Sequence, residues 1–285
     1  MIGFQANRMV FFLAFLGLNV FLFNIYSEAR SEQQNVLQSN QTIPIEQRLA
    51  SEDIKYSGEL SDEYLSGYYL SGEQTDLAAA LREAQGEKRL TEATTVKGQQ
   101  LTHISSGGFY ISDDTQAEKT VNEYLQRKDQ VLYGDEYHYR KNLSLLDQEY
   151  PTIVASQSYE TIPFNDSSSR IDMTLASSDK LLQIAKYTQT HISNITPLRE
   201  KMTLYSEKEA VNTLYLNNKL PSHSKILWTE LAYTRILIVG DRNVYIPAWF
   251  VAVKADADVN IQIETVNAFS NRIITNNAVQ KVENP

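Results

Sequence analysis

The sequence contains no cysteine among its 285 residues. Disulfide bonds, thiolate zinc sites, cysteine nucleophiles and lipid attachment through cysteine are therefore excluded. Histidine is nearly as scarce, and the four residues are His103, His138, His191 and His223. No two of them stand four positions apart, and no carboxylate–histidine spacing resembles a zinc site, so we expect no metal centre.

The chain also lacks any cluster of lysine and arginine. It carries 26 basic against 35 acidic side chains, for a formal net charge of −9. An acidic body without a basic patch is repelled by the phosphate backbone, and we therefore expect no nucleic-acid binding. The same charge disfavours adhesion of the body to anionic lipid.

No catalytic motif is complete. Residues 177–180 and 222–225 both match S-x-x-K, the serine–lysine pairing of penicillin-interacting enzymes. That chemistry needs the serine one helical turn before the lysine, whereas both matches run into predicted strands, and the S-D-N and K-T-G elements are missing. Residues 256–260 begin like a calcium loop but lack the glycine at position six and the glutamate at position twelve. We predict that the protein is not an enzyme and has no catalytic residues and no cofactor.

One long hydrophobic run is present, at residues 9–26, and it contains no charged side chain. As a helix it would be about 27 Å long, at roughly 1.5 Å per residue. This length is close to the hydrocarbon thickness of a bilayer, so the run predicts a transmembrane anchor. Two alternatives remain: a secretory signal cleaved after the weak site Ser27-Glu28-Ala29, or a buried helix of a soluble protein.

The anchor divides the chain into five parts. We expect a cytoplasmic stub at 1–8, the transmembrane anchor at 9–26, a stalk at 27–41, a first extracytoplasmic α+β region at 42–198, and a second unit of helix and antiparallel sheet at 199–285. Arg8 and Arg30 flank the anchor on opposite sides, so the count of basic residues barely sets its orientation. The short stub is the easier part to leave in the cytoplasm, and we expect a single-pass protein of the cell membrane.

The body repeats one order of elements, in which a helix precedes a meander of strands. Capping boxes at 115–118 and 206–209 predict two helix starts. Their apolar stripes are Ala117, Val121, Tyr124 and Leu125, with Lys128, in the first helix, and Ala210, Val211, Leu214 and Tyr215 in the second. Strand-like segments follow at 137–146, 152–159, 169–176 and 181–192, and again at 225–239, 244–254 and 260–269. Antiparallel sheets with a helix on one face belong to the α+β class.

Three details of the strands are specific enough to test. Residues 101–111 read as a hairpin broken by two glycines. The strand at 244–254 is apolar on both faces, which indicates a central position, with Pro247 confined to its edge or start. In the last strand we expect one buried and one wet face, from the alternation of Ile261, Ile263 and Thr265 with Gln262 and Glu264.

A polar residue inside the anchor is the best candidate for a partner contact. Asn19 lies near the middle of the run, where an unpaired amide is costly and an amide from a neighbouring helix can satisfy it. The side chains on the same helical face are Phe12, Phe15, Leu16, Leu22, Phe23 and Tyr26. The alternative is that a single-span anchor tolerates one asparagine without any function.

The chain resembles the YycI (WalI) regulatory proteins in three segments. These are FFLAFLGLNVFLFNIY at 11–26, YIPAWFV at 245–251 and VNAFS at 266–270. The resemblance implies an outward α+β body of PepSY-like or cystatin-like units behind one anchor. The stub departs from the family pattern, because Arg8 is its only basic side chain.

The resemblance also implies a function. It implies a non-enzymatic regulator of an essential cell-wall two-component sensor histidine kinase (the WalK/WalR system). The regulator would act with the related YycH protein through transmembrane and extracytoplasmic contacts. The alternative from another class is an extracytoplasmic sensor that binds a ligand or the cell wall. Its sign would be an exposed aromatic cluster, for which the candidates are Tyr68, Tyr69, Tyr137 and Tyr139.

We expect Asn19→Leu to weaken the association with the kinase roughly threefold, because interhelical hydrogen bonds in membranes contribute about 0.6 kcal/mol on average. Co-purification yield and expression of the kinase's regulon measure the effect, with a folded body in both proteins. Asn24→Leu is the matched control, since Asn24 points to another face near the interface. Equal yields for the two variants and the native chain would remove Asn19 from the contact.

Overall fold

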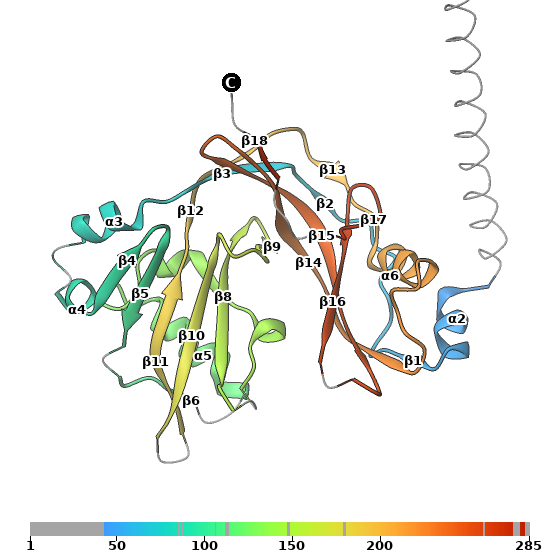
Figure 1. Ribbon diagram of the computed structural model, residues 1–285, viewed down its shortest axis with the longest axis horizontal. Coiled ribbons are helices and arrows are strands. Elements are labelled where there is room, and N and C mark those ends of the chain that lie inside the picture. The colour runs from blue at the N-terminus through green and yellow to red at the C-terminus, as the bar shows by residue number, and fades with distance from the viewer. Residues whose placement is uncertain are drawn as a thin grey trace, which may run out of the picture. The chain divides into compact units, whose positions relative to one another are not determined.

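The computed structural model (Figure 1) describes residues 43–84, 86, 88–105, 107–111, 114–146, 149–178, 181–258, 260–275 and 280–282. The expected stub, anchor and stalk lie outside these residues. Within the described ranges, no helix has both the length and the hydrophobicity needed to cross a bilayer. The chain forms two compact units, residues 1–52 and 53–285. The described part of the first unit contains helix α2 (Ile45–Ser51), and the second unit contains all the other elements.

One of the two large sheets of the second unit is covered by helix α5 (Asp114–Leu125), and we call it the α5 sheet. Its order is β4 (Thr94–Lys97), β5 (Gln100–Ile104), β11 (Leu181–Gln189), β10 (Arg170–Ser178), β8 (Thr152–Tyr159) and β7 (Tyr137–Tyr139). Strand β6 (Tyr110–Ile111) also pairs with β11, and β9 (Ile162–Pro163) with β8. Helices α3 (Leu77–Glu83) and α4 (Lys88–Glu92) precede β4, and the short helices η1 (Gly134–Glu136) and η2 (Lys141–Leu143) flank β7.

The predicted stripe of α5 lies inside the core of this sheet. Ala117, Val121, Tyr124 and Leu125 are all buried, whereas Lys128 follows the end of the helix. They pack with side chains from β5, β8, β10 and β11, among them Leu101, Ile153, Met173, Ile184 and Tyr187. The prediction of an amphipathic helix over a sheet is thus confirmed.

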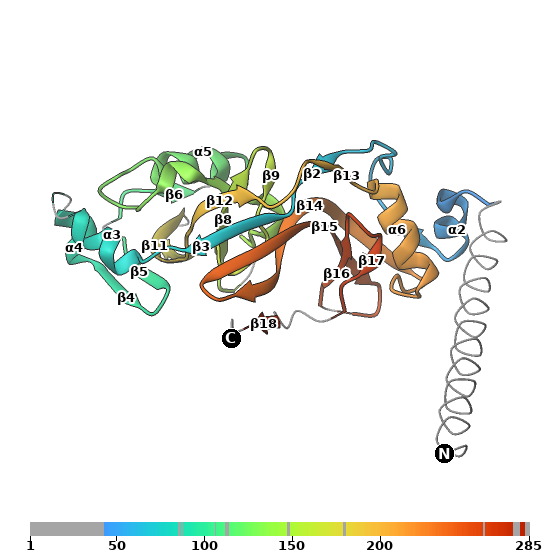
Figure 2. The same ribbon diagram turned by 90° about the horizontal axis from the view of Figure 1, so that it is seen from above.

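The other large sheet packs against helix α6 (Glu207–Leu216), and we call it the α6 sheet. Its order is β1 (Ile54–Lys55), β14 (Ser224–Val239), β15 (Arg242–Ala255), β16 (Gln262–Asn267) and β17 (Arg272–Ile273). Three further strands join it, β3 (Leu70–Gln74), β12 (Ile192–Pro197) and β18 (Gln280–Val282). A separate ribbon pairs β2 (Ser66–Gly67) with β13 (Met202–Thr203). Figure 2 shows α6 beside β16 and β17.

The start of α6 confirms the predicted capping box. The Ser206 hydroxyl accepts from the Glu209 backbone N–H at 3.3 Å, and the Glu209 carboxylate accepts from the Ser206 N–H at 2.8 Å. Two backbone N–H groups at the start of the helix are thereby satisfied. Ala210, Val211 and Leu214 are buried beneath the helix, which fixes α6 against the sheet.

Strand β15 is central, as its apolar pattern predicts, but the expected place of Pro247 is wrong. One edge of β15 pairs with β14 along the whole strand, and the other pairs first with β3, over 242–245, and then with β16, over 248–253. Pro247 lies at the change of partner. Its carbonyl accepts from the Ala268 N–H at 3.0 Å, so its nitrogen faces the same edge, where no ladder bond is lost.

The expected hairpin at 101–111 is also wrong. Strands β5 and β6 do not pair with each other, because both pair with β11, and the hairpin partner of β5 is β4. The two glycines, at φ 89° and 91°, turn the chain within the loop between β5 and β6. Both strands are antiparallel to β11 and therefore run in the same direction, so the glycines mark a loop between two consecutive partners of β11 and not a reversal of the chain.

The expected alternation of β16 is not observed. Residues 262 and 263 are exposed and residues 264 to 266 are buried, so burial depends on position along the strand and not on the face. Ile261 and Ile263 are 46 % and 47 % exposed, whereas Glu264 is only 7 % exposed. The Glu264 carboxylate lies 3.7 Å from the Lys219 ammonium and accepts a hydrogen bond from Gln262 at 2.5 Å. These partners, supplied just after α6 and by the strand itself, allow the carboxylate to be buried.

Gly134 provides a sharp test of this packing, because a Cβ built there would lie 1.9 Å from the Leu125 carbonyl oxygen. We expect Gly134→Ala to lower the free energy of unfolding by about 3 kcal/mol, since a rigid backbone atom blocks the methyl group. Urea denaturation of the body measures the loss. Gly86→Ala is the control, because a Cβ there meets no heavy atom within 4 Å. Equal midpoints for the two variants would contradict the close approach.

Candidate functional site

The residues expected to contact a partner within the membrane lie outside the described part of the chain. They are Phe12, Phe15, Leu16, Asn19, Leu22, Phe23 and Tyr26, and they stay a prediction. In the ranges that the structure describes, no group of three or more histidine, aspartate or glutamate side chains is arranged to hold a metal ion. In the second S-x-x-K match, Ser222 precedes β14 and Lys225 is the second residue of that strand, so neither lies on a helix.

The four tyrosines proposed as a binding platform do not form one. Tyr137 is 2 % exposed and packs in the core of the α5 sheet. Tyr68 meets the ring of Tyr159 edge-on at 5.9 Å, and Tyr69 stacks on Phe269 at 4.5 Å. Each ring is engaged in its own packing contact, so the structure gives no joint aromatic surface at these positions.

The structure concentrates its buried polar contacts where the two sheets of the second unit meet. The described chain passes from the α6 sheet to the α5 sheet after β3, and returns between β11 and β12. The two passages are side by side, because the Thr75 N–H donates to the His191 carbonyl at 2.9 Å. We refer to this region as the junction.

The apolar part of the junction is a small aromatic core. Phe164, which follows β9, packs its ring at 5.2 Å from that of Tyr233 on β14 and at 5.1 Å from that of Tyr245 on β15. Leu70 and Ile192 complete the buried set. Burial raises the pKa of Tyr233 to about 12, and so keeps this phenol neutral.

The charged part of the junction is the ion pair of Arg140 and Glu230. The Arg140 guanidinium is almost completely buried, and its Nη2 lies 2.9 Å from a carboxylate oxygen of Glu230 on β14. Its Nη1 donates to the Ser156 hydroxyl at 2.7 Å and to the Phe164 carbonyl at 2.8 Å. One side chain from the loop after β7 therefore links β8, the segment after β9 and β14.

Further polar contacts surround this pair. The Asn165 N–H donates to the Tyr233 carbonyl at 2.8 Å, and the Ser168 hydroxyl lies 2.7 Å from the Tyr245 hydroxyl. Asp166 lies 3.5 Å from the Arg235 guanidinium. Because these bonds are directional, they fix how the segment at 164–168 lies on the β14–β15 hairpin.

His191 closes the other side of the junction. Its Nδ1 lies 2.7 Å from the Thr75 hydroxyl and its Nε2 lies 3.0 Å from a Glu136 oxygen, while the Tyr133 ring stacks on it at 4.3 Å. A carboxylate only accepts, so Nε2 carries the proton in the neutral ring and Nδ1 accepts from Thr75. Burial lowers the pKa of His191, and the nearby Glu136 charge opposes that shift. A hollow of about 300 Å³ adjoins this cluster.

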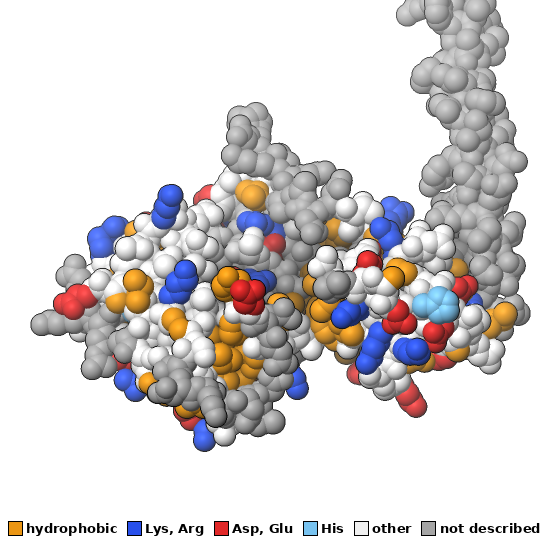
Figure 3. All heavy atoms as spheres, turned by 60° about the horizontal axis from the view of Figure 1, so that its bottom comes forward, with side chains coloured by type: hydrophobic (Ala, Val, Ile, Leu, Met, Phe, Trp, Pro, Cys, Tyr) orange, Lys and Arg blue, Asp and Glu red, His pale blue; other side chains and the backbone are white. Residues whose placement is uncertain are grey.

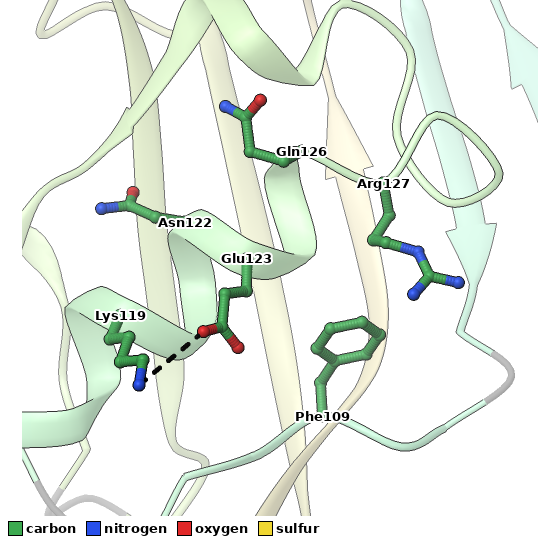
Figure 4. Close-up of a pocket in the computed structure, with 6 residues that line it drawn as sticks. All are labelled: Phe109, Lys119, Asn122, Glu123, Gln126 and Arg127. Atoms are coloured by element: carbon green, nitrogen blue, oxygen red, sulfur yellow. Dashed lines mark ion pairs between the residues drawn. The ribbon is translucent and has the colours of Figure 1, made fainter.

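A larger hollow, of about 590 Å³, lies along α5 (Figure 4). Its lining is Phe109, Lys119, Asn122, Glu123, Gln126 and Arg127. Lys119 and Glu123 form an exposed ion pair at 4.0 Å. Two amides and an ion pair beside an aromatic ring can hold a small polar ligand, but they include no hydroxyl or thiol nucleophile.

Sequence reasoning missed the junction completely. Arg140 and Glu230 each lie in strand-like polar patterns that also suit exposed residues, and 90 positions separate them in the sequence. Only the three-dimensional pairing of β14 with the segment after β9 brings them together. A single sequence contains no signal for such a pair.

Comparisons with known proteins give one informative match. A family model described as "YycI protein" matches residues 31–269. None of the curated proteins compared with the chain matches it. Two solved structures are similar at low identity. The chain is 9 % identical to an uncharacterized protein from Eubacterium rectale, with a TM-score of 0.44, over 79 % of this chain and 91 % of that one. It is 10 % identical to the YpeB C-terminal domain of Bacillus megaterium, with a TM-score of 0.36, over 70 % and 96 %. At these TM-scores the two structures are too different from this chain for an inference about its fold or function.

We expect Arg140→Met to reduce the free energy of unfolding by about 3 kcal/mol, because it leaves the Glu230 carboxylate without its partner. The double variant Arg140→Met with Glu230→Leu should recover most of this loss, since it removes both charges. Urea denaturation of the two single variants and the double variant completes the cycle. Additive losses would show that the pair does not couple the two sheets.

Proposed function

Because the chain belongs to the YycI family, we propose that it is a membrane-anchored regulator of the cell-wall sensor histidine kinase WalK and acts together with a YycH-like protein. The YycI family is a regulatory family and not an enzyme family, and it has its role in the WalK system. The observation that carries the proposal is the family match, which spans nearly the whole body.

In the proposed mechanism, residues 9–26 span the membrane with the stub inside and the body outside, and the Asn19 face packs against the spans of the kinase complex. A kinase with two conformations responds to any partner that packs better against one of them. A difference of about 1 to 2 kcal/mol changes the ratio of the two states by roughly five- to thirtyfold. Helix packing alone can supply a free-energy difference of this size, without a catalytic group.

The junction supports the part that we assign to the body. The Arg140–Glu230 pair, the aromatic core around Phe164 and the His191 cluster connect the two sheets at several separate points. Contacts of this kind are bistable or rigid and not continuously deformable. A YycH-like protein bound to one sheet would therefore act on a body that responds as a unit.

Exchange of residues 9–26 for an unrelated apolar span of equal length tests the proposal in cells that produce the otherwise native chain. We expect the kinase no longer to co-purify with the chain, and the kinase's regulon to shift to the level seen without the chain. A native body, checked by protease resistance, ensures that only the anchor has changed. Unchanged co-purification together with unchanged regulon output would refute regulation through the membrane span.

A further inference from the structure

On its face opposite helix α6, the α6 sheet is partly uncovered at one end of β14, β15 and β16. Residues directly opposite each other on antiparallel strands share a face. Ile263 lies opposite Ala252, and Ala252 lies opposite Trp228, so these three side chains share one face of β16, β15 and β14. Phe250 belongs to the same face and packs with Trp228 and Ile274.

This surface exposes side chains that a folded body normally buries. Ile263 is 47 % and Ile261 46 % exposed, while the carboxylate of Glu264 is turned to the covered side. A strand that buries its glutamate and presents its isoleucines has the reverse of the arrangement that water favours. The two exposed isoleucines make this face a candidate contact surface.

Two lysines lie at the end of the same face. Lys225 and Lys254 are directly opposite each other, and Lys254 is two positions from Ala252, so both share the face of Ile263. Both are exposed, and neither forms an ion pair with any residue that the structure describes. In a chain with a net charge of −9, this is a local positive border on an apolar surface. Figure 3 shows hydrophobic surface on the body with lysine and arginine side chains beside it.

The backbone of β16 offers the same region as a strand edge. Strand β17 pairs with β16 only at Val266 and Asn267, and the Thr265 carbonyl accepts from the Ile274 N–H at 2.8 Å. Because peptide groups alternate along a strand, those of Ile263 point to the same edge as those of Thr265. Among the described residues, no strand pairs with that edge at Ile263. An open edge is a template for an added strand.

We propose that this face docks an extended, acidic segment of a partner protein, which adds to β16 as a further strand. Its apolar side chains pack on Ile263 and Ile261 of the adjoining strand, and its carboxylates point towards the lysine border, of which Lys254 on β15 is the nearer residue. The main-chain bonds supply affinity, and the positive border selects against basic segments. The inference goes beyond the proposed function, because it names a surface and a segment chemistry without presupposing the kinase.

Site-specific photo-crosslinking in cells that produce the intact chain tests the proposal. A benzophenone amino acid replaces Ile263, and in a control chain it replaces Ile104, an exposed isoleucine on β5 of the other sheet. We expect an adduct with a partner protein at position 263 and none at 104. Mass spectrometry should map the adduct to a partner segment that is acidic and alternates apolar with polar residues.

A second variant tests the charge border. Lys225→Glu combined with Lys254→Glu should lower the yield of the adduct at least about fivefold, because both border charges are reversed. Lys97→Glu combined with Lys186→Glu is the matched control on the α5 sheet, and it should leave the yield unchanged. Both lysines of the control are exposed.

Four results would overturn the inference: no adduct at 263, an adduct with lipid or with a second copy of this chain, equal adducts at 263 and 104, or a yield insensitive to the two border charges. The result is separable from the proposed function. Loss of the adduct with kinase association intact overturns only this surface. An adduct that persists in a chain that fails to associate with the kinase overturns only the proposed function.

Discussion

The buried guanidinium of Arg140 determines how the two sheets pack against each other. Arg140 reaches from the loop after β7 into the interface, where its guanidinium is almost completely buried and, if unpaired, would cost several kcal/mol. Its Nη1 donates to the Ser156 hydroxyl and the Phe164 carbonyl, and its Nη2 forms an ion pair with the Glu230 carboxylate. The three partners belong to three different segments. The guanidinium holds each of these segments in place by its contact with it. If the sheets separated, the buried charge of Arg140 would lose its partner.

Around this pair, apolar contacts stabilise the interface and hydrogen bonds fix its orientation. The rings of Phe164, Tyr233 and Tyr245 bury apolar area, which stabilises the interface without fixing an orientation. The hydrogen bonds of Asn165 and Ser168 have preferred angles and therefore fix the orientation. At the two chain passages His191 adds the same kind of restraint to Thr75 and Glu136. The combination explains how two sheets with separate cores can behave as one body.

Local features of the sequence predicted the local structure well. The capping box of α6, the buried stripe of α5 and the central place of β15 each depend on residues within one or two turns or strands, where spacing alone sets the outcome. The limits of β8 were also predicted correctly, at 152–159. The chemistry of a short segment is sufficient for these features, because the interactions that decide them lie inside the segment.

The features that no pattern predicted all depend on distant partners. Arg242 donates to the Ser71 hydroxyl across 171 positions, and β3 thereby occupies an edge of β15 that local reasoning assigned to no strand. That change of edge partner is also what permits Pro247 in mid-strand. The burial of Glu264 depends on Lys219, which comes from outside the strand and gives the carboxylate an ion-pair partner. The junction belongs to this class, whereas the anchor contacts at Asn19 were argued from the sequence and remain a prediction.

Strand β14 belongs both to the exposed face, through Trp228, and to the junction, through Glu230. Trp228 and Glu230 are two positions apart on that strand, and they share one face, since they lie opposite Ala252 and Phe250. A strand bonded to a neighbour along its length cannot absorb a displacement within two residues, because each residue is held in the ladder. A segment bound at Ile263 would therefore act on β14 through the cross-strand neighbours Ala252 and Trp228, and through the ion pair of Glu230 on the α5 sheet. Regulation through binding requires such a path, in which binding at one surface changes the packing energy at another.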